Sequence, residues 1–145
     1  MVGGDAMARH CETFDHTADV GLAARADTRC ELMSALAEGL ADVMCDRAQV
    51  ASARQRRVVV ESEDAGALVV DFLSRLLLAF EVDRFLVAEA RVWQCGEASL
   101  SADLLGEHYD SARHELRNEV KAVTYHELKV ARENDEWVAR VILDL

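Results

Sequence analysis

The chain contains no proline and few aromatic residues, and it lacks the motifs that assign an enzymatic function directly. Among its 145 residues, seven are glycine and 6% are aromatic. Without proline no rigid linker marks a domain boundary, so a chain of this length is expected to form one domain. The scattered glycines form no phosphate-binding loop, and no Ser/His/Asp pattern or HExxH motif is present. The motifs of the sequence therefore specify no enzyme.

Long apolar runs and closely paired cysteines are missing too. The longest apolar run is far shorter than the roughly 20 residues of a membrane-spanning helix, and no basic stretch followed by an apolar one marks a signal peptide. The four cysteines, at positions 11, 30, 45 and 95, include no CxxC pair, which argues against a zinc ribbon. Thiols among apolar neighbours are typical of reduced, buried cysteines. We therefore expect a cytoplasmic protein that binds no membrane.

Acidic residues are abundant. Lysine and arginine number 16 and aspartate and glutamate 27, so the formal charge is 16 − 27 = −11. An acidic surface repels phosphate groups, so strong direct binding of nucleic acid is not expected. The only dense basic run, Arg54-Gln55-Arg56-Arg57, is interpreted as the solvated end of a strand.

Two stretches have the periodicity of amphipathic helices. Apolar residues recur every four positions from Leu32 to Met44, after a capping box at Thr28–Glu31. This pattern predicts a helix of about 17 residues that ends near Asp46. A second helix is predicted from Asp64, a favourable N-cap, to Asp83. Apolar side chains cover more than half of its circumference, so it should be largely buried.

Alternating patterns predict strands in the rest of the chain. Short strands are expected at 11–15, 20–26 and 57–61, and longer ones at 86–93, 98–104, 120–130 and 137–143. Turns are expected at Gly96 and at 134–136, and a polar surface loop at 108–118. We interpret residues 1–10 as a flexible leader and 11–145 as a single α+β domain, in which two helices pack on a mostly antiparallel or mixed β-sheet.

Carboxylates near both ends of the chain are the strongest candidates for a functional site. Asp15, His16 and Asp19 lie within five residues, and Asp144 precedes Leu145. In a continuous strand Asp15 and Asp19 would share a face but lie about 13 Å apart, so only a bend could bring them to one ion. A site that joins one of them to Asp144 and the terminal carboxylate of Leu145 is more economical. Oxygen ligands suit Ca²⁺ or Mg²⁺. The alternative is that the aspartates bond to backbone amides in a bend.

Four other residues could support such a site or contact a partner. His16 and His126 carry imidazoles, which can act as acids or bases near neutral pH or bond to the backbone. Glu119 and Lys121 flank Val120 and would share a face of an extended strand. They would then form an exposed ion pair or a contact patch.

Three segments, in this order along the chain, resemble the archease family. They are 15–21 (Asp-His-Thr-Ala-Asp-Val-Gly), 119–126 (Glu-Val-Lys-Ala-Val-Thr-Tyr-His) and 141–145 (Val-Ile-Leu-Asp-Leu). The resemblance runs from about Glu12 to the last residue, and the leucine-rich helix after Asp64 is similar too. Any one segment is modest evidence, whereas three in order are specific.

The resemblance implies a chaperone-like partner protein rather than an enzyme. Archeases assist the GTP-dependent RNA ligase of the RtcB type in tRNA splicing and RNA repair, by promoting guanylylation and multiple turnover of the ligase. The resemblance also implies a bound divalent metal, usually calcium, with magnesium or manganese as alternatives. Its ligands would be Asp19, Asp144 and Leu145, and Asp15 is not among them. The competing interpretations are a metal-dependent hydrolase and a general chaperone or adaptor.

Overall fold

The computed structural model describes residues 9–16 and 19–145, apart from the side chain of His16. Most of the expected leader, and Thr17 and Ala18, where a bend was expected, lie outside the described residues. The elements are β1 (His10–His16), β2 (Asp19–Ala26), α2 (Arg29–Met44), the 3-10 helix η1 (Arg47–Gln49), β3 (Arg54–Glu61), α3 (Ala65–Asp83), β4 (Phe85–Cys95), β5 (Ser99–His108), β6 (Ala122–Glu133) and β7 (Glu136–Asp144).

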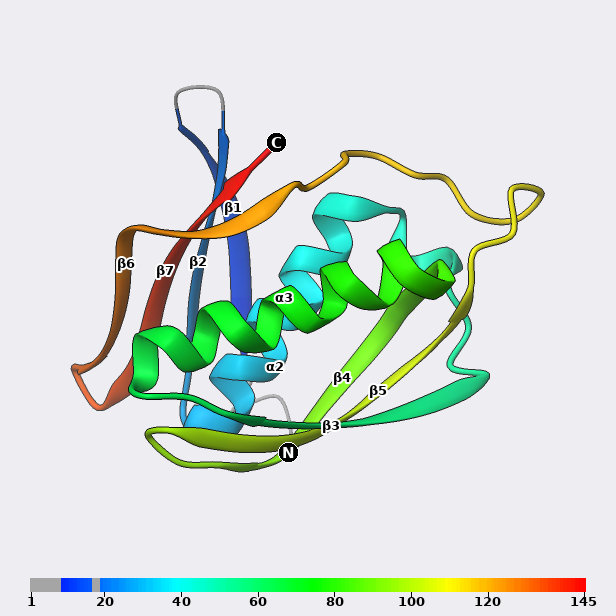
Figure 1. The fold of residues 1–145 in the computed structure, drawn as a ribbon. Coiled ribbons are helices and arrows are strands. Elements are labelled where there is room, and N and C mark those ends of the chain that lie inside the picture. The colour runs from blue at the N-terminus through cyan, green and yellow to red at the C-terminus, as the bar shows by residue number, and fades with distance from the viewer. Residues whose placement is uncertain (1–8, 17–18) are drawn as a thin grey trace, which may run out of the picture.

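The described strands form two sheets, and the two long helices lie between them (Figure 1). One sheet has four strands in the order β1-β2-β7-β6, and the other has three in the order β3-β5-β4. Within both sheets, each pair of neighbouring strands is antiparallel. The α+β class with two packed helices is confirmed. The division of the strands between two sheets was not predicted.

Both helices begin where the sequence indicates. The Thr28 hydroxyl accepts a hydrogen bond from the Glu31 amide at 3.1 Å, and the Asp64 carboxylate accepts one from the Ala67 amide at 2.8 Å. Each bond satisfies an amide that has no partner within its helix. At the other end of α3, Arg84 takes a left-handed conformation with φ of 59° and directs the chain into β4.

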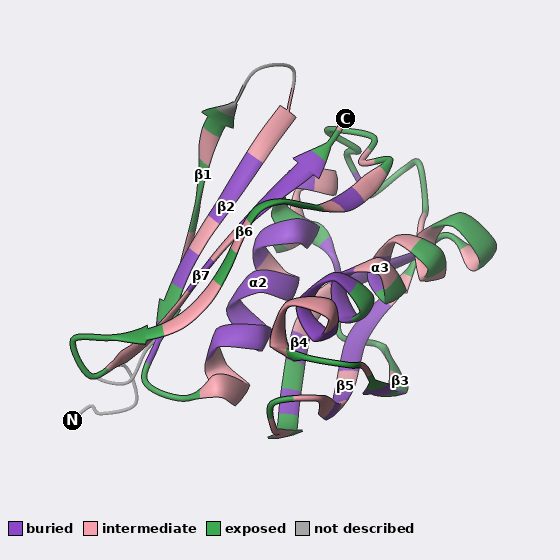
Figure 2. Ribbon diagram, turned by 60° about the vertical axis from the view of Figure 1, so that its left-hand side comes forward, coloured by how far each residue is buried: buried purple, intermediate pink, exposed green. Residues whose placement is uncertain are grey.

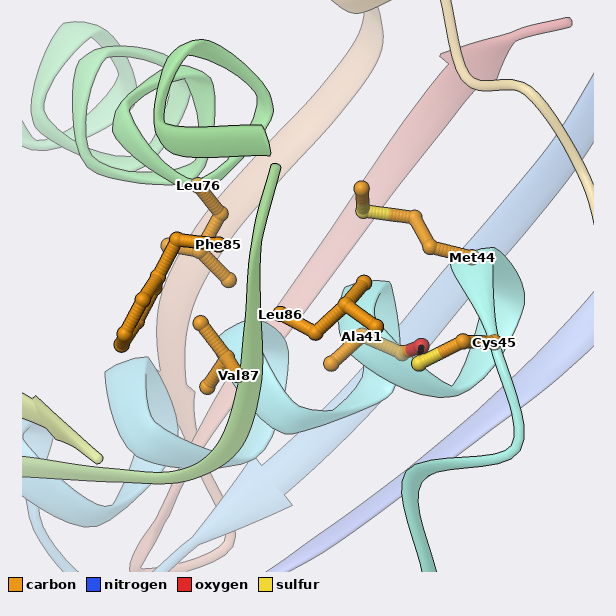
Figure 3. Close-up of a pocket in the computed structure, with 7 residues that line it drawn as sticks. All are labelled: Ala41, Met44, Cys45, Leu76, Phe85, Leu86 and Val87. Carbon is orange, nitrogen blue, oxygen red and sulfur yellow. Dashed lines mark hydrogen bonds between the residues drawn. The ribbon is translucent and has the colours of Figure 1, made fainter. Parts of the chain in front are cut away.

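The core fills the space between the sheets, where both helices turn their apolar faces inward (Figure 2). Leu36, Leu40, Phe72 and Leu73 are fully buried there. A small gap of about 10 Å³ remains in this core. Its lining is drawn in Figure 3: Ala41, Met44, Cys45, Leu76, Phe85, Leu86 and Val87. The gap holds at most about one water, so it is a packing defect and not a ligand site.

The loop predicted at 108–118 is exposed over most of its length, but it is anchored to the end of α2. The Arg117 amide donates to the Met44 carbonyl at 2.8 Å, and the Asn118 amide donates to the Val43 carbonyl at 3.2 Å. These bonds satisfy carbonyls that the last turn of a helix leaves without partners. No helix among the described residues is long and apolar enough to cross a membrane.

Candidate metal centre

Asp19 and Asp144 are brought together at one end of the four-stranded sheet. Asp19 is the first residue of β2, Asp144 is the last residue of β7, and the antiparallel register pairs them directly. Side chains paired in this way share a face of the sheet, with Cβ atoms about 4.5–5.5 Å apart. Asp19 is half-buried and Asp144 is exposed. The two ends of the sequence therefore form one acidic pair that solvent can reach.

The donor atoms around this pair fit a hard cation. Like charges placed opposite each other repel, and a cation between two carboxylates relieves that repulsion. Leu145 follows Asp144 in the chain, and its main-chain oxygens belong to the same class of hard donor. The Lys121 amide donates to the Asp144 carbonyl at 2.8 Å, which fixes the main chain at this point.

Side chains alone do not complete a coordination shell here. The described part of the chain contains no cluster of three or more His, Cys, Asp or Glu side chains that could hold a metal ion. Ca²⁺ takes six to eight oxygen ligands, whereas Mg²⁺ keeps several waters. Main-chain oxygens, water or groups of a partner would therefore supply the ligands beyond the two carboxylates.

Asp15 and Asp19 do not share a face of the sheet. They belong to two strands of a hairpin, in which Asp15 pairs with Val20 and His16 pairs with Asp19. Because neighbouring residues of a strand point to opposite faces, Asp15 lies on the opposite face from Asp19. It lines a shallow depression with Asp42 on the helix side of the sheet. The backbone of His16 lies opposite Asp19, and its side chain is outside the described residues.

Phe14, which directly precedes the segment 15–21, packs on Gly21 within it, a contact that the sequence did not reveal. The Phe14 ring lies over Gly21, where an added Cβ would be 2.0 Å from the Phe14 Cζ atom. The Arg140 guanidinium lies 4.0 Å from the centre of the same ring. Gly21 is therefore required by the close approach of an aromatic ring.

His126 lies on a bulge in β6 and not beside the acidic pair. The register between β6 and β7 shifts within residues 124–129, and Glu127 adopts a φ of 53°. His126 Nε2 lies 3.2 Å from Glu127 Oε2, and Glu127 Oε1 lies 3.7 Å from Arg140 Nη2. Since Arg140 packs on Phe14, these contacts connect the segment 119–126 to the residue just before the segment 15–21.

Glu119 and Lys121, expected on one face of an extended strand, lie just before β6. β6 begins at Ala122, so both residues precede it, and both are exposed. The main chain is diverted here because residues 117 and 118 cap α2. Glu119 and Lys121 instead line a groove of about 670 Å³, which we call the α3 groove. It is lined by Leu77, Phe80 and Glu81 of α3, the C-cap Arg84, residues 116–121, and Met44.

A hydrogen-bonded cluster that joins Glu107 of β5 to Arg113 and the buried His114 of the following loop was missed by sequence reasoning. The Glu107 carboxylate accepts the Ala51 amide at 2.8 Å and lies 2.6 Å from Arg113 Nη2. His114, 5% exposed, accepts the Asp110 amide at Nδ1, so its proton lies on Nε2 and is donated to Glu107 at 2.8 Å. The bonds from Ala51, Arg113 and His114 lower the pKa of Glu107 to about 2. No periodicity signals a buried histidine within a polar segment.

Comparison with known proteins identifies the family. Residues 11–145 match the model of the Archease protein family (MTH1598/TM1083). The protein archease of Methanosarcina barkeri is 37% identical over 138 residues, which cover 92% of this chain and 94% of that protein. The protein archease of Thermococcus gammatolerans is 37% identical over 142 residues, which cover 94% of this chain and 99% of that protein.

Solved structures agree with this match. The solution structure of Methanobacterium thermoautotrophicum protein 1598 superposes with a TM-score of 0.77 at 34% identity, covering 93% of this chain and 98% of that one. The crystal structure of a Thermotoga maritima archease, described as a possible chaperone, superposes with a TM-score of 0.67 at 18% identity. The match covers 92% of this chain and 96% of that one, and it supports the fold. The resemblance noted in the sequence is confirmed, and this chain belongs to the archease family.

Proposed function

We propose that this archease is a non-catalytic activator of a GTP-dependent RNA ligase of the RtcB type. In this proposal it holds a divalent cation, calcium in the first instance, with the carboxylates of Asp19 and Asp144 and a main-chain oxygen of Leu145. The observation that carries the proposal is the cross-strand pairing of Asp19 with Asp144 on a face that a partner can reach.

The acidic pair is suited to presenting a cation rather than enclosing it. Strand pairing fixes both aspartates, while Asp144 is exposed and leaves one side of the pair open. A divalent cation neutralises negative charge on phosphate oxygens. A cation with open coordination positions at this sheet end could therefore be shared with the ligase, where GTP and metal must be arranged. The net charge of −11 also favours a protein partner over RNA.

The decisive experiment measures guanylylation of the ligase with and without this protein. Wild-type protein should accelerate guanylylation in the presence of Ca²⁺, and Asp19→Asn and Asp144→Asn should lose most of that stimulation. Asp15→Asn is the matched control, because Asp15 belongs to the same hairpin but lies on the opposite face. If both site variants fold and stimulate the ligase fully, the proposed metal role is wrong.

A general chaperone is the second candidate function. It is favoured by exposed apolar side chains near the end of α3, such as Leu78 and Val82, and by the description of the Thermotoga maritima relative as a possible chaperone. This function predicts suppressed aggregation of unrelated proteins, with no dependence on Asp19 or Asp144. A metal-dependent hydrolase would instead show turnover by the isolated protein.

A further inference from the structure

An apolar residue is buried beside the acidic pair on the outer face of the four-stranded sheet, the face turned away from the helices. Ile142 is 1% exposed, although the residues on either side of it belong to the core, so its own side chain points to the outer face. It is paired with Gly21. Along their strands, Gly21 lies two positions from Asp19 and Ile142 two positions from Asp144, so all four residues share this face.

The Phe14 ring covers this part of the face. An added Cβ on Gly21 would lie 2.0 Å from Phe14 Cζ, so the tip of the ring occupies the place of the missing side chain. Directly paired residues have Cβ atoms about 4.5–5.5 Å apart, which puts the ring next to Ile142. The acidic pair is therefore bounded on one side by an apolar wall, and its low polarity strengthens the attraction between carboxylates and a cation.

Arg140 of β7 holds this ring across β2. Its guanidinium carbon lies 4.0 Å from the centre of the Phe14 ring, a distance typical of cation–π contacts. Because β2 lies between β1 and β7 in the sheet, the contact fastens the β1–β2 hairpin to the strand that carries Asp144. Arg140 Nη2 also lies 3.7 Å from Glu127 Oε1 on β6. A planar guanidinium can stack on a ring and meet a carboxylate at its edge at the same time.

The carboxylate that meets Arg140 is placed there by a bulge. Glu127 has a φ of 53° and lies within residues 124–129, where the register between β6 and β7 shifts. A residue with a side chain is strained in this left-handed conformation, and such strain persists where the surrounding structure enforces it, often at functional sites. Bulges redirect side chains. This one directs Glu127 towards Arg140, so all four strands contribute to the contacts around the ring.

We propose that Arg140 is a positioning residue of the cation site, which acts through Phe14 to keep Asp19 opposite Asp144. Two like charges at the end of a sheet repel each other, and the contact of Arg140 with the ring opposes their separation. A site that is already held in its bound geometry binds more tightly, because less freedom is lost on binding. This inference rests on the proposed function, to which the cation belongs.

Titration of the purified protein with Ca²⁺ in a calorimeter separates positioning from an effect of charge. Arg140→Gln removes a positive charge near the acidic pair, so charge alone would make Ca²⁺ bind more tightly. Positioning predicts the opposite, a loss of affinity of about tenfold. Arg140→Lys keeps the charge but loses the planar stacking, and it should weaken binding too.

Arg25→Gln is the matched control for these variants. Arg25 lies on the same face of β2 as Asp19 and is also near a glutamate, Glu136, at 4.0 Å. It stands six positions from Asp19 and belongs to a different ion pair from Arg140. Replacing it removes the same charge from the same face without touching the contact between Arg140 and Phe14, so Ca²⁺ affinity should not fall.

A double substitution tests the route through the ring. Phe14→Leu should itself weaken Ca²⁺ binding, and adding Arg140→Gln should cost little more, because both changes break the same chain of contacts. Fully additive losses would overturn the route through Phe14. If the Arg140 variants fail to fold, Phe14→Leu alone decides: a folded Phe14→Leu protein with wild-type affinity for Ca²⁺ overturns the inference.

The outcomes separate this inference from the proposed function. If wild-type protein binds Ca²⁺ and activates the ligase, and folded Arg140→Gln binds Ca²⁺ equally well or more tightly, positioning is overturned and the proposed function stands. A lower melting temperature of Arg140→Gln with unchanged Ca²⁺ affinity would mean a purely structural role and overturn the inference as well. If wild-type protein binds no Ca²⁺, the proposed metal role and the positioning role are both overturned.

Discussion

Asp19 and Asp144 are directly paired across β2 and β7, although they stand near opposite ends of the sequence. Their neighbours, Val20 and Leu143, form the next pair and point into the core, where Leu143 is 0% exposed. A slip of one residue would turn these apolar side chains to solvent, so the core enforces the register that places the two carboxylates opposite each other.

Replacing either aspartate of the pair should abolish stabilisation by metal. Ca²⁺ should raise the melting temperature of the wild-type protein, because a ligand that binds only the folded state stabilises it. Asp19→Asn and Asp144→Asn should lose this shift in differential scanning fluorimetry. Without metal Asp144→Asn should be as stable as wild type or more so, by roughly 0.2–1 kcal/mol, since a like-charge repulsion is removed. Equal shifts in all three proteins would refute the site.

Gly21→Ala should destabilise the fold through a clash with Phe14. The added Cβ would lie 2.0 Å from Phe14 Cζ, and displacing the ring should cost about 1–3 kcal/mol in urea unfolding. Gly96→Ala is the control, because its nearest neighbour atom lies 3.9 Å away. In a Phe14→Ala background the Gly21 substitution should cost much less. An undiminished cost in that background would show that the ring is not the cause.

The stability difference between wild type and Glu107→Gln should depend on pH. Hydrogen bonds from Ala51, Arg113 and His114 lower the pKa of Glu107 from 4.5 to about 2. A lowered pKa means that the ionised carboxylate stabilises the folded state above pH 4.5 and loses this effect as the pH falls towards 2. We expect the variant to be less stable by about 1–3 kcal/mol at pH 7. The difference should shrink below pH 4.5 in denaturant titrations; a constant difference would exclude this origin.

The cysteines should react slowly in the folded protein. Burial raises the pKa of Cys11 to about 12 and the pKa values of Cys45 and Cys95 to about 11, and it also raises the pKa of Cys30. Because the thiolate is the reactive form, alkylation by iodoacetamide at pH 8 should be slow until urea unfolds the chain. Rapid labelling of one cysteine under native conditions would contradict this and indicate local opening around it.

Local signals in the sequence predicted the helices well. Thr28 and Asp64 accept the capping hydrogen bonds that their positions indicate, because a cap depends on residues only three positions apart. The turn at Asn134 and Asp135 was predicted for the same reason, and both residues adopt positive φ.

Predictions that depended on long-range contacts were less successful. Glu119 and Lys121 lie outside β6 because the preceding residues cap α2, which is distant in sequence. The bulge around Glu127 interrupts an alternating pattern that looks regular in the sequence. The burial of His114 depends on Glu107 and Asp110, whose positions no local pattern specifies.

The sequence by itself determined the α+β class, the helix starts and the family, because capping, periodicity and motifs are local properties. It also nominated Asp19 and Asp144, but it left open whether Asp15 belonged with them. Only the tertiary structure decided that Asp15 lies on the other face and that Asp19 faces Asp144. The reason is that strand register is set by burial of residues such as Leu143 in the shared core, which no single segment contains.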